Sequence, residues 1–413
     1  MLHLIIDSAP HKTLSYLPQA LFFCCLVIWT SDGIGFLRVP GTAYFYVPAL
    51  VFFCALSSIN FIKIPTFPIS YSYIIIVFLL SIPHFYSFFP EHASHGTTTA
   101  VSVSVILMLL IACSFFLAID CKNRPYTYFL GISSAFALAS IFSAAIAFLG
   151  YFQYLPSIQE PAYVRLTGLP GNPNYLAQTL APGFLCIIAL SVMSRRHGFV
   201  RILLYLAAAV VAAAMLITGS RGWLIATAAA LYFGWISITR GFFRGAVVVL
   251  LPILLVAVAL LIPPVLVEYG LLHRRFSTLE SGRADIARTL LANFSNGTLS
   301  EILFGRGNGW FSSEFRSAHS SWLRFLIDYG LIGLLSLATA FIFSFIKLAR
   351  SFRAYPPILF IIVSVFFLSS IVALFNDGIF VGSKTDYWIL MLILGFLLIK
   401  PTGSEASSNN SIR

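Results

Sequence analysis

Long uninterrupted apolar runs constrain this chain more than any other feature of its sequence. Of its 413 residues, 59% are hydrophobic and only 9% are charged, whereas soluble domains carry about 25% charged residues. The apolar residues form continuous runs of about 20, the length of a helix that crosses a bilayer, rather than short alternating strands. The sequence therefore predicts an all-α polytopic membrane protein.

We predict about 12 transmembrane helices. Helices one to nine, with short loops, occupy residues 1–263, and helices ten to twelve occupy 319–400. Between them lies the one larger polar loop, 264–318, and the Ser/Asn-rich segment 401–413 is expected to be a disordered cytoplasmic tail. The expected spans are 14–30, 43–61, 69–89, 98–119, 127–150, 174–193, 200–218, 221–239, 246–263, 319–347, 357–376 and 384–400.

The placement of Lys and Arg predicts the orientation. With the N-terminus inside, the inner segments hold 14 of the 25 basic residues and three of the 14 acidic ones, and the outer side holds eleven of each. Because cytoplasmic loops carry the excess of Lys and Arg, this favours an N-in, C-in topology with loop 264–318 outside. The net charge of +11 then follows from topology. It does not indicate nucleic-acid binding, because no basic cluster is interleaved with exposed aromatic residues.

Two outer segments have features of ordered structure. Residues 283–294 have apolar side chains at helical spacing after Ser281 and Gly282, which predicts a short helix within the large loop. Residues 305–309, Gly-Arg-Gly-Asn-Gly, predict a turn, and so does the Pro/Gly-rich stretch that ends at Asn174.

Three outer arginines are candidates for binding an anion, because a guanidinium can grip a phosphate with two parallel hydrogen bonds. Arg221 lies in the tight turn Thr-Gly-Ser-Arg-Gly at 218–222, Arg165 lies beside a Gly/Pro turn, and Arg283 opens the loop helix. The alternative for Arg221 is a side chain that snorkels to lipid headgroups, and for Arg165 a solvated loop charge. The remaining loop arginines are expected to balance nearby Glu280, Asp285, Glu301 and Glu314; they are Arg274, Arg275, Arg288, Arg306 and Arg316.

His319 opens the tenth predicted span. Its imidazole can take up a proton near neutral pH, although a helix-capping histidine is an equal alternative. On a continuous helix, Gly330 and Gly333 fall within about 40° of it, which predicts a small-residue stripe that lets another helix approach closely. Arg324 and Asp328 lie on the opposite face at i,i+4 spacing and are expected to pair with each other.

Several other functions lack their usual motifs. The Gly305–Gly309 segment has no following Gly-Lys-Ser/Thr, so it is no phosphate-binding P-loop, and neither Gly-x-Ser-x-Gly nor His-Glu-x-x-His occurs. The predicted spans hold almost no Asp or Glu, which argues against an ion-coupled transporter. No acidic metal-binding cluster is visible, so we expect neither a metal nor a cofactor.

Taken in order, the outer motifs resemble those of the bacterial O-antigen ligase and O-antigen polymerase family. The resemblance is firmest over about residues 160–335. It consists of Arg165-Leu-Thr-Gly with Asn172-Pro-Asn174, then Thr218-Gly-Ser-Arg221-Gly, Ser281-Gly-Arg283, Leu303-Phe-Gly305-Arg-Gly307, and His319-Ser320 with nine residues before Gly330-Leu-Ile-Gly333.

The resemblance implies a glycosyltransferase of the bacterial inner membrane with its site facing the periplasm. Its donor would be a glycan on undecaprenyl diphosphate, and its acceptor a sugar hydroxyl of the lipid A core. His319 would be the general base, Arg221, Arg283 and Arg165 would hold the diphosphate, and Gly330 and Gly333 would shape the site by helix packing. The reaction would invert the anomeric carbon without a metal.

Other functions remain open at this stage. A polymerase would use a second lipid-linked glycan as acceptor, and a related enzyme would glycosylate a protein. Outside this chemistry, the chain could be a transporter of lipid-linked saccharides or a non-catalytic scaffold.

Overall fold

The computed structural model describes residues 125–151, 166, 168, 172–194, 197–239, 283–306, 320–353 and 355–374. Within these ranges every regular element is a helix and no strand occurs, which confirms the predicted all-α class for this part of the chain. Six predicted spans lie outside the described residues, and the division of the chain at residues 263, 318 and 400 stays a prediction. Those six spans are 14–30, 43–61, 69–89, 98–119, 246–263 and 384–400.

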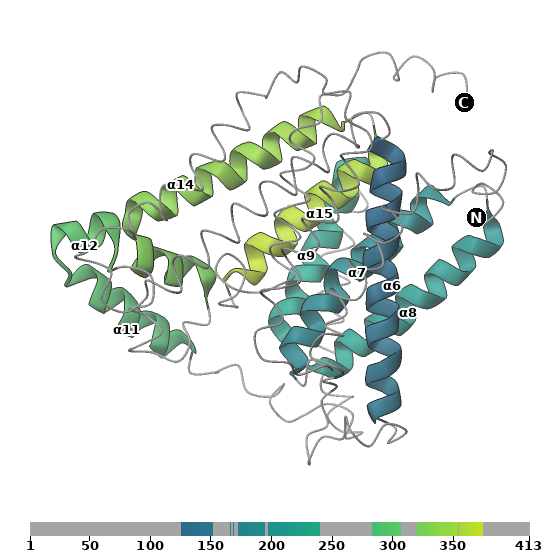
Figure 1. Cartoon of the computed structure of the whole chain (residues 1–413), viewed down its shortest axis with the longest axis horizontal. Helices are drawn as coiled ribbons and strands as arrows, with labels where there is room; N and C mark the ends of the chain where they lie inside the picture. The colour runs from purple at the N-terminus through teal and green to yellow at the C-terminus, as the bar shows by residue number, and fades with distance from the viewer. Residues whose placement is uncertain are drawn as a thin grey trace, which may run out of the picture.

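Apart from α12 (Leu299–Phe304), which the sequence did not predict, the described helices follow the predicted elements within a few residues (Figure 1). Apart from the tenth span, which is discussed below, the largest difference is that the helix predicted over 357–376 ends at Val372. The helices are α6 Pro125–Tyr151, α7 Pro173–Met193, α8 Gly198–Thr218, α9 Arg221–Ile238, α11 Arg283–Ser295, α12 Leu299–Phe304, α14 Ser321–Ser351 and α15 Pro356–Val372.

Local sequence explains where these helices begin and end. In α7, Pro173 is an early residue that needs no amide hydrogen, and the Asn172 side chain accepts a hydrogen bond from the Asn174 amide. The last residue of α8 is followed by Gly219 with φ 63°, a left-handed conformation that glycine adopts without strain. Pro356 opens α15 in the same manner as Pro173 opens α7.

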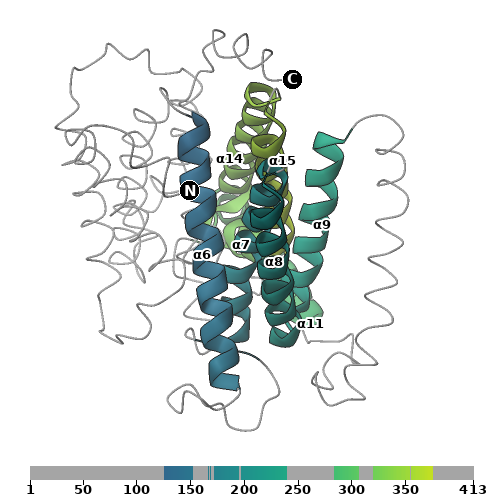
Figure 2. The same ribbon diagram turned by 90° about the vertical axis from the view of Figure 1, so that its right-hand side faces the viewer.

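Helix α7 lies at the centre of a bundle formed by α6, α7, α8, α9 and α15, as Figure 2 shows from the side. It contacts each of the other four helices, and most of its side chains are buried. The most extensive pairing is between α9 and α15. Because Ser364 donates to the Ala230 carbonyl and Phe360 contacts Gly234, these two helices run antiparallel.

Two glycines allow the closest approaches within the bundle. A side-chain carbon on Gly183 of α7 would overlap Ser140 of α6, and one on Gly234 of α9 would overlap the Ser364 hydroxyl of α15. Small residues at such crossings are typical of helix packing in membranes.

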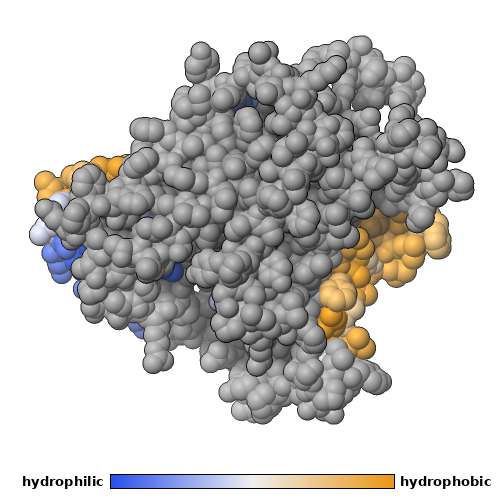
Figure 3. All heavy atoms as spheres, viewed as in Figure 1, coloured by the Kyte–Doolittle hydropathy of each residue, from blue (hydrophilic) through white to orange (hydrophobic). Residues whose placement is uncertain are grey.

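Three of the described helices, α7, α8 and α14, are long and apolar enough to cross a membrane by length and composition. Helix α8 is apolar yet mostly exposed, with Phe199, Ile202 and Leu206 among its exposed side chains. Figure 3 shows this as an apolar surface at the position of α8. Such a surface suits contact with lipid.

Candidate functional site

Three of the sequence motifs meet at one end of the bundle. The Leu166 amide donates to the Ile217 carbonyl over 3.3 Å, and the Ser220 hydroxyl donates to the Asn174 side-chain oxygen over 2.8 Å. These bonds join the segment after Arg165, the start of α7 and the turn between α8 and α9. We call this end of the five-helix bundle the Ser220 end; the predicted topology places it on the outer side of the membrane.

The turn between α8 and α9 is tight and internally bonded. The Thr218 hydroxyl donates to the Met215 carbonyl over 2.6 Å and accepts from the Ser220 amide over 3.3 Å. Thr218 and Ser220 are buried, whereas Arg221, the first residue of α9, is partly exposed. These bonds stabilise the turn immediately before Arg221.

Helix α14 is broken at Gly330, and the structure corrects the prediction of one helix over 319–347. Gly330 has φ 67° and ψ −169°, a backbone region open essentially only to glycine. We call residues 321–329 the short arm and 331–351 the long arm. The helical wheel that aligned His319 with Gly330 and Gly333 requires a continuous helix, so it does not apply beyond the break.

The short arm folds back along the long arm. The Trp322 and Phe341 rings have centroids 6.5 Å apart, whereas nineteen residues of straight helix would separate them by about 28 Å. Figure 1 shows the two arms meeting beside α12. At about 1.5 Å per residue, the long arm can cross a bilayer core of about 30 Å, and the nine-residue short arm cannot.

The two glycines of the Gly-x-x-Gly motif have different roles in this hairpin. Gly330 makes the turn. At Gly333, a side-chain carbon would overlap the Tyr329 Cβ and lie 3.7 Å from the Phe325 ring, so its small size lets the arms pack together. The sequence predicted that these glycines admit another helix; the close neighbours of Gly333 belong to α14 itself.

The backbone around the break at Gly330 also contacts the end of α12. Leaving the helix frees the Ile327 carbonyl, which accepts a hydrogen bond from the Arg306 amide over 2.9 Å. Gly305 has φ 83° and ψ −177°, the same glycine-only region as Gly330. A side-chain carbon on Gly305 would overlap the Asp328 backbone, and one on Gly330 would overlap that of Leu303. The two backbones are thus in direct contact.

The start of the short arm is attached to the end of α15. The Ser321 amide donates to the Ala373 carbonyl over 2.8 Å, and the Ser320 hydroxyl donates to the same carbonyl over 3.3 Å. The Trp322 indole donates to the Ser370 carbonyl over 3.3 Å. The Ser320 hydroxyl also accepts from the Leu323 amide. The entry of the chain into α14 is therefore fixed by the protein itself.

Because α9 and α15 pair antiparallel, the attachment of α14 to the end of α15 lies at the same height along the bundle as Arg221. Ala230 and Ser364 are in contact across the antiparallel pair. Arg221 lies nine residues before Ala230 in α9, and Ala373 lies nine residues after Ser364, just past the end of α15. Since both paths rise by about 1.5 Å per residue, Arg221 and Ser320 lie at the same end of the bundle.

Helix α11 packs against the short arm of α14. Leu290 of α11 packs against Ile327 of the short arm, and Ile286 and Leu323, one turn earlier in each helix, join the same cluster. Arg306 donates both to the Asn293 carbonyl near the end of α11 and to the Ile327 carbonyl near the end of the short arm, so the two helices run in the same direction. Arg283 lies seven residues before Leu290, and Ser320 lies seven residues before Ile327.

The predicted charge pairs of the outer segments are confirmed where they are described. Arg324 and Asp328 approach to 3.5 Å, and the Asp328 side chain is fully buried. Arg288 pairs with Asp285 at 3.3 Å on the surface. Arg306 pairs with Glu301 at 3.5 Å.

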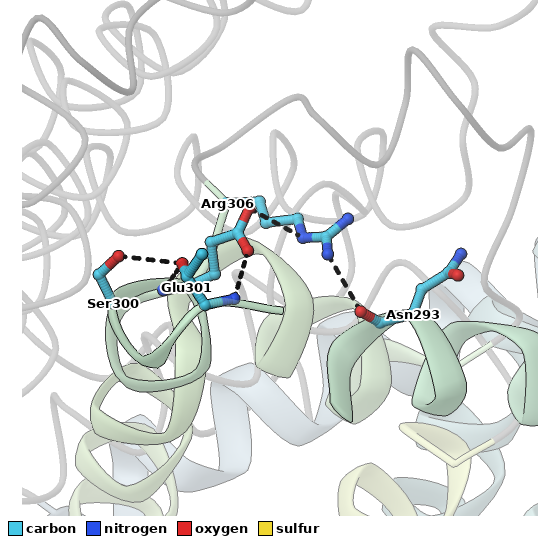
Figure 4. Close-up of polar contacts among 5 residues, drawn as sticks. Asn293, Ser300, Glu301 and Arg306 are labelled. Atoms are coloured by element: carbon cyan, nitrogen blue, oxygen red, sulfur yellow. Dashed lines mark hydrogen bonds and ion pairs between the residues drawn. The ribbon is translucent and has the colours of Figure 1, made fainter. Parts of the chain in front are cut away.

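Arg306 makes more contacts than a balancing charge would. Besides its ion pair with Glu301, its guanidinium donates to the Asn293 carbonyl of α11 over 3.0 Å (Figure 4). Glu301 in turn accepts from the Thr298 amide in the capping box of α12. Arg306 thereby connects α11, α12 and, through its own amide, the short arm.

We expect Arg306→Ala to destabilise the outer helices by about 1–2 kcal/mol, because it removes a charge-assisted hydrogen bond and a half-buried ion pair. Thermal unfolding and limited proteolysis of 283–306 measure this. Arg288→Ala is the matched control: its ion pair is about 80% exposed on both sides, so it should cost less than about 0.5 kcal/mol. Equal effects of the two substitutions would contradict the connecting role of Arg306.

The predicted site residues divide into two groups. Arg221, Gly330 and Gly333 are described with their surroundings, and the backbone of Arg283 begins α11. His319 and Arg165 lie outside the described residues. Their chain neighbours, Ser320 and Leu166, are both hydrogen-bonded at the Ser220 end.

Neither Asn174 nor Ser220 has a role that was predicted from the sequence. They are 46 positions apart, and nothing in a single sequence signals that their side chains meet. In the described part of the chain, no group of three or more His, Cys, Asp or Glu side chains is placed to hold a metal ion.

Comparisons of the chain with protein-family models and with curated proteins found no match.

Proposed function

We propose that this chain is an O-antigen ligase-like glycosyltransferase. It would move a glycan from undecaprenyl diphosphate to a sugar hydroxyl of the lipid A core, at the periplasmic face of the bacterial inner membrane. One observation carries the proposal: Arg221 and Ser320, far apart in sequence, share one end of the bundle, and α11, which begins at Arg283, packs against the short arm that follows Ser320.

The proposed reaction needs a base and an anion-binding group. The acceptor oxygen attacks the anomeric carbon while His319 takes the hydroxyl proton. The bond from that carbon to the diphosphate oxygen breaks, and undecaprenyl diphosphate leaves with the bonding electrons. Arg221 and Arg283, with Arg165, would stabilise its growing charge through charge-assisted hydrogen bonds. Direct attack inverts the anomeric carbon.

A reconstituted transfer assay tests the proposal. Purified protein in lipid vesicles receives a glycan on undecaprenyl diphosphate together with a lipid A core acceptor. The expected products are glycosylated core and free undecaprenyl diphosphate. Joined carrier-linked repeats without core product would instead identify a polymerase, and glycan on an added protein acceptor a protein glycosyltransferase. Movement of the donor across the bilayer without a new glycosidic bond would identify a transporter.

We expect Arg221→Lys to lower transfer by about tenfold or more, because lysine keeps the charge and loses the two-pronged contact with phosphate. The rate at saturating donor measures this. Arg201→Lys is the matched control, since Arg201 is exposed near the start of α8, where it donates to the Tyr205 hydroxyl. Wild-type transfer by the Arg221 variant would contradict the diphosphate contact.

A further inference from the structure

A buried side-chain hydrogen bond links α7 to the Arg221 turn. The Ser220 hydroxyl is buried and donates to the Asn174 side-chain oxygen over 2.8 Å, whereas the Ser220 backbone amide donates to the Thr218 hydroxyl within the turn. The backbone of Asn174 is itself held, because its backbone amide donates to the Asn172 side-chain oxygen over 2.9 Å. Helix α7, the centre of the bundle, thereby supports the residue immediately before Arg221.

We propose that Asn174 is a positioning residue for Arg221, acting through Ser220. The side-chain oxygen of Asn174 fixes the Ser220 hydroxyl, and this sets the backbone direction with which Arg221 leaves the turn. Arg221 is the first residue of α9, so the conformation of the turn before it sets where its side chain starts. That turn includes Gly219, whose φ of 63° ends α8 and whose missing side chain leaves that residue the least restricted of the turn.

The geometry separates this role from simple stabilisation of the bundle. Helices α7 and α8 already pack along their length through buried residues such as Leu180, Ala208 and Val211. Loss of one hydrogen bond at the end of that interface leaves the apolar packing in place. The main consequence should therefore fall on Arg221 and on whatever anion it binds.

The inference rests on the proposed function, because it takes the anion to be the diphosphate of a lipid carrier. Its test uses undecaprenyl diphosphate without a glycan, bound to the full-length protein in lipid nanodiscs. Asn174→Ala and Ser220→Ala should each weaken binding by about tenfold, the effect of one lost contact to a charged group. The double variant should bind no more weakly than either single variant, because both remove the same hydrogen bond.

Repeating the Asn174 substitution in a protein that already lacks the Arg221 side chain makes the test specific for Arg221. In an Arg221→Ala protein, Asn174→Ala should cause no further loss of binding, because the residue it positions is gone. A tenfold loss in both backgrounds, or none in the wild-type background, would overturn the proposal. Ser191→Ala, at the opposite end of α7, is the control, since its hydroxyl contacts only the Ile188 carbonyl of its own helix. If Asn174→Ala fails to fold, Ser220→Ala, which loses a single hydroxyl, gives the same comparison.

Different results would contradict the proposed function and the positioning role of Asn174. A wild-type protein that binds no undecaprenyl diphosphate would contradict the proposed function. Positioning is then measured on an Arg221→Cys protein, by the rate at which a charged thiol reagent labels the cysteine. Asn174→Ala should change this rate by several-fold, and an unchanged rate would overturn the inference as well.

Discussion

His319→Ala is expected to lower glycan transfer by about 10²–10⁴-fold, the usual contribution of a general base, while the protein stays folded. Its fold should survive because the neighbours of residue 319 anchor the start of α14. Ser320 and Ser321 both bond to the Ala373 carbonyl. Single-turnover transfer in vesicles, together with the thermal unfolding temperature of the same preparation, measures both expectations.

The control for this prediction is His197→Ala. His197 is exposed just before α8, at the end of the bundle opposite Ser220, and its side chain makes no capping hydrogen bond. Transfer by this variant should equal that of the wild type. Full activity of the His319 variant would remove this histidine from the mechanism and would leave the acceptor hydroxyl without the base we assign.

Gly330→Ala is expected to have the second large effect, by preventing the hairpin of α14 from closing on α12. The added carbon would overlap the Leu303 carbonyl, and the backbone conformation with φ 67° would be strained by about 1–3 kcal/mol. Hydrogen exchange should rise at residues 299–306 and 321–329. Transfer should fall because this contact holds the short arm, which follows His319 in the chain, against the end of α12.

Gly198→Ala provides the comparison for the glycine substitution. Gly198 is the first residue of α8, and a side-chain carbon there meets nothing within 4 Å. Alanine should be neutral or slightly stabilising at that position, because it favours the helix over glycine. If Gly330→Ala were equally harmless in hydrogen exchange, the folded-back arrangement of the two arms would be wrong.

Apart from α12, which was not predicted, and the break in α14, the sequence was sufficient to predict the positions of the described helices. Apolar runs the length of a bilayer crossing, bounded by Asn172-Pro173, Gly219 and Pro356, fix those helices by local chemistry alone. The ion pair of Arg324 with Asp328 was also predictable, because residues four apart on a helix share a face.

The break in α14 could not be predicted in the same way. A glycine in an apolar helix usually indicates close packing, and Leu331 and Ile332 continue the apolar pattern without interruption. Gly330 turns the chain because Gly305 and Leu303, about 25 positions earlier, occupy the space beside it. The same holds for Asn174 and Ser220. Periodicity carries information about neighbours along one helix, and these contacts join separate elements.

The contact between Gly305 and Gly330 also has a consequence for synthesis. Residues 303–306 leave the ribosome before 327–330, so the amide of Arg306 is already present when the Ile327 carbonyl emerges. An isolated run of 31 residues over 321–351 would favour a single long helix in the membrane. The earlier segment can act as a template that turns the first nine residues back before that helix forms. Moving residues 283–306 to the end of the chain should therefore delay assembly of the outer helices.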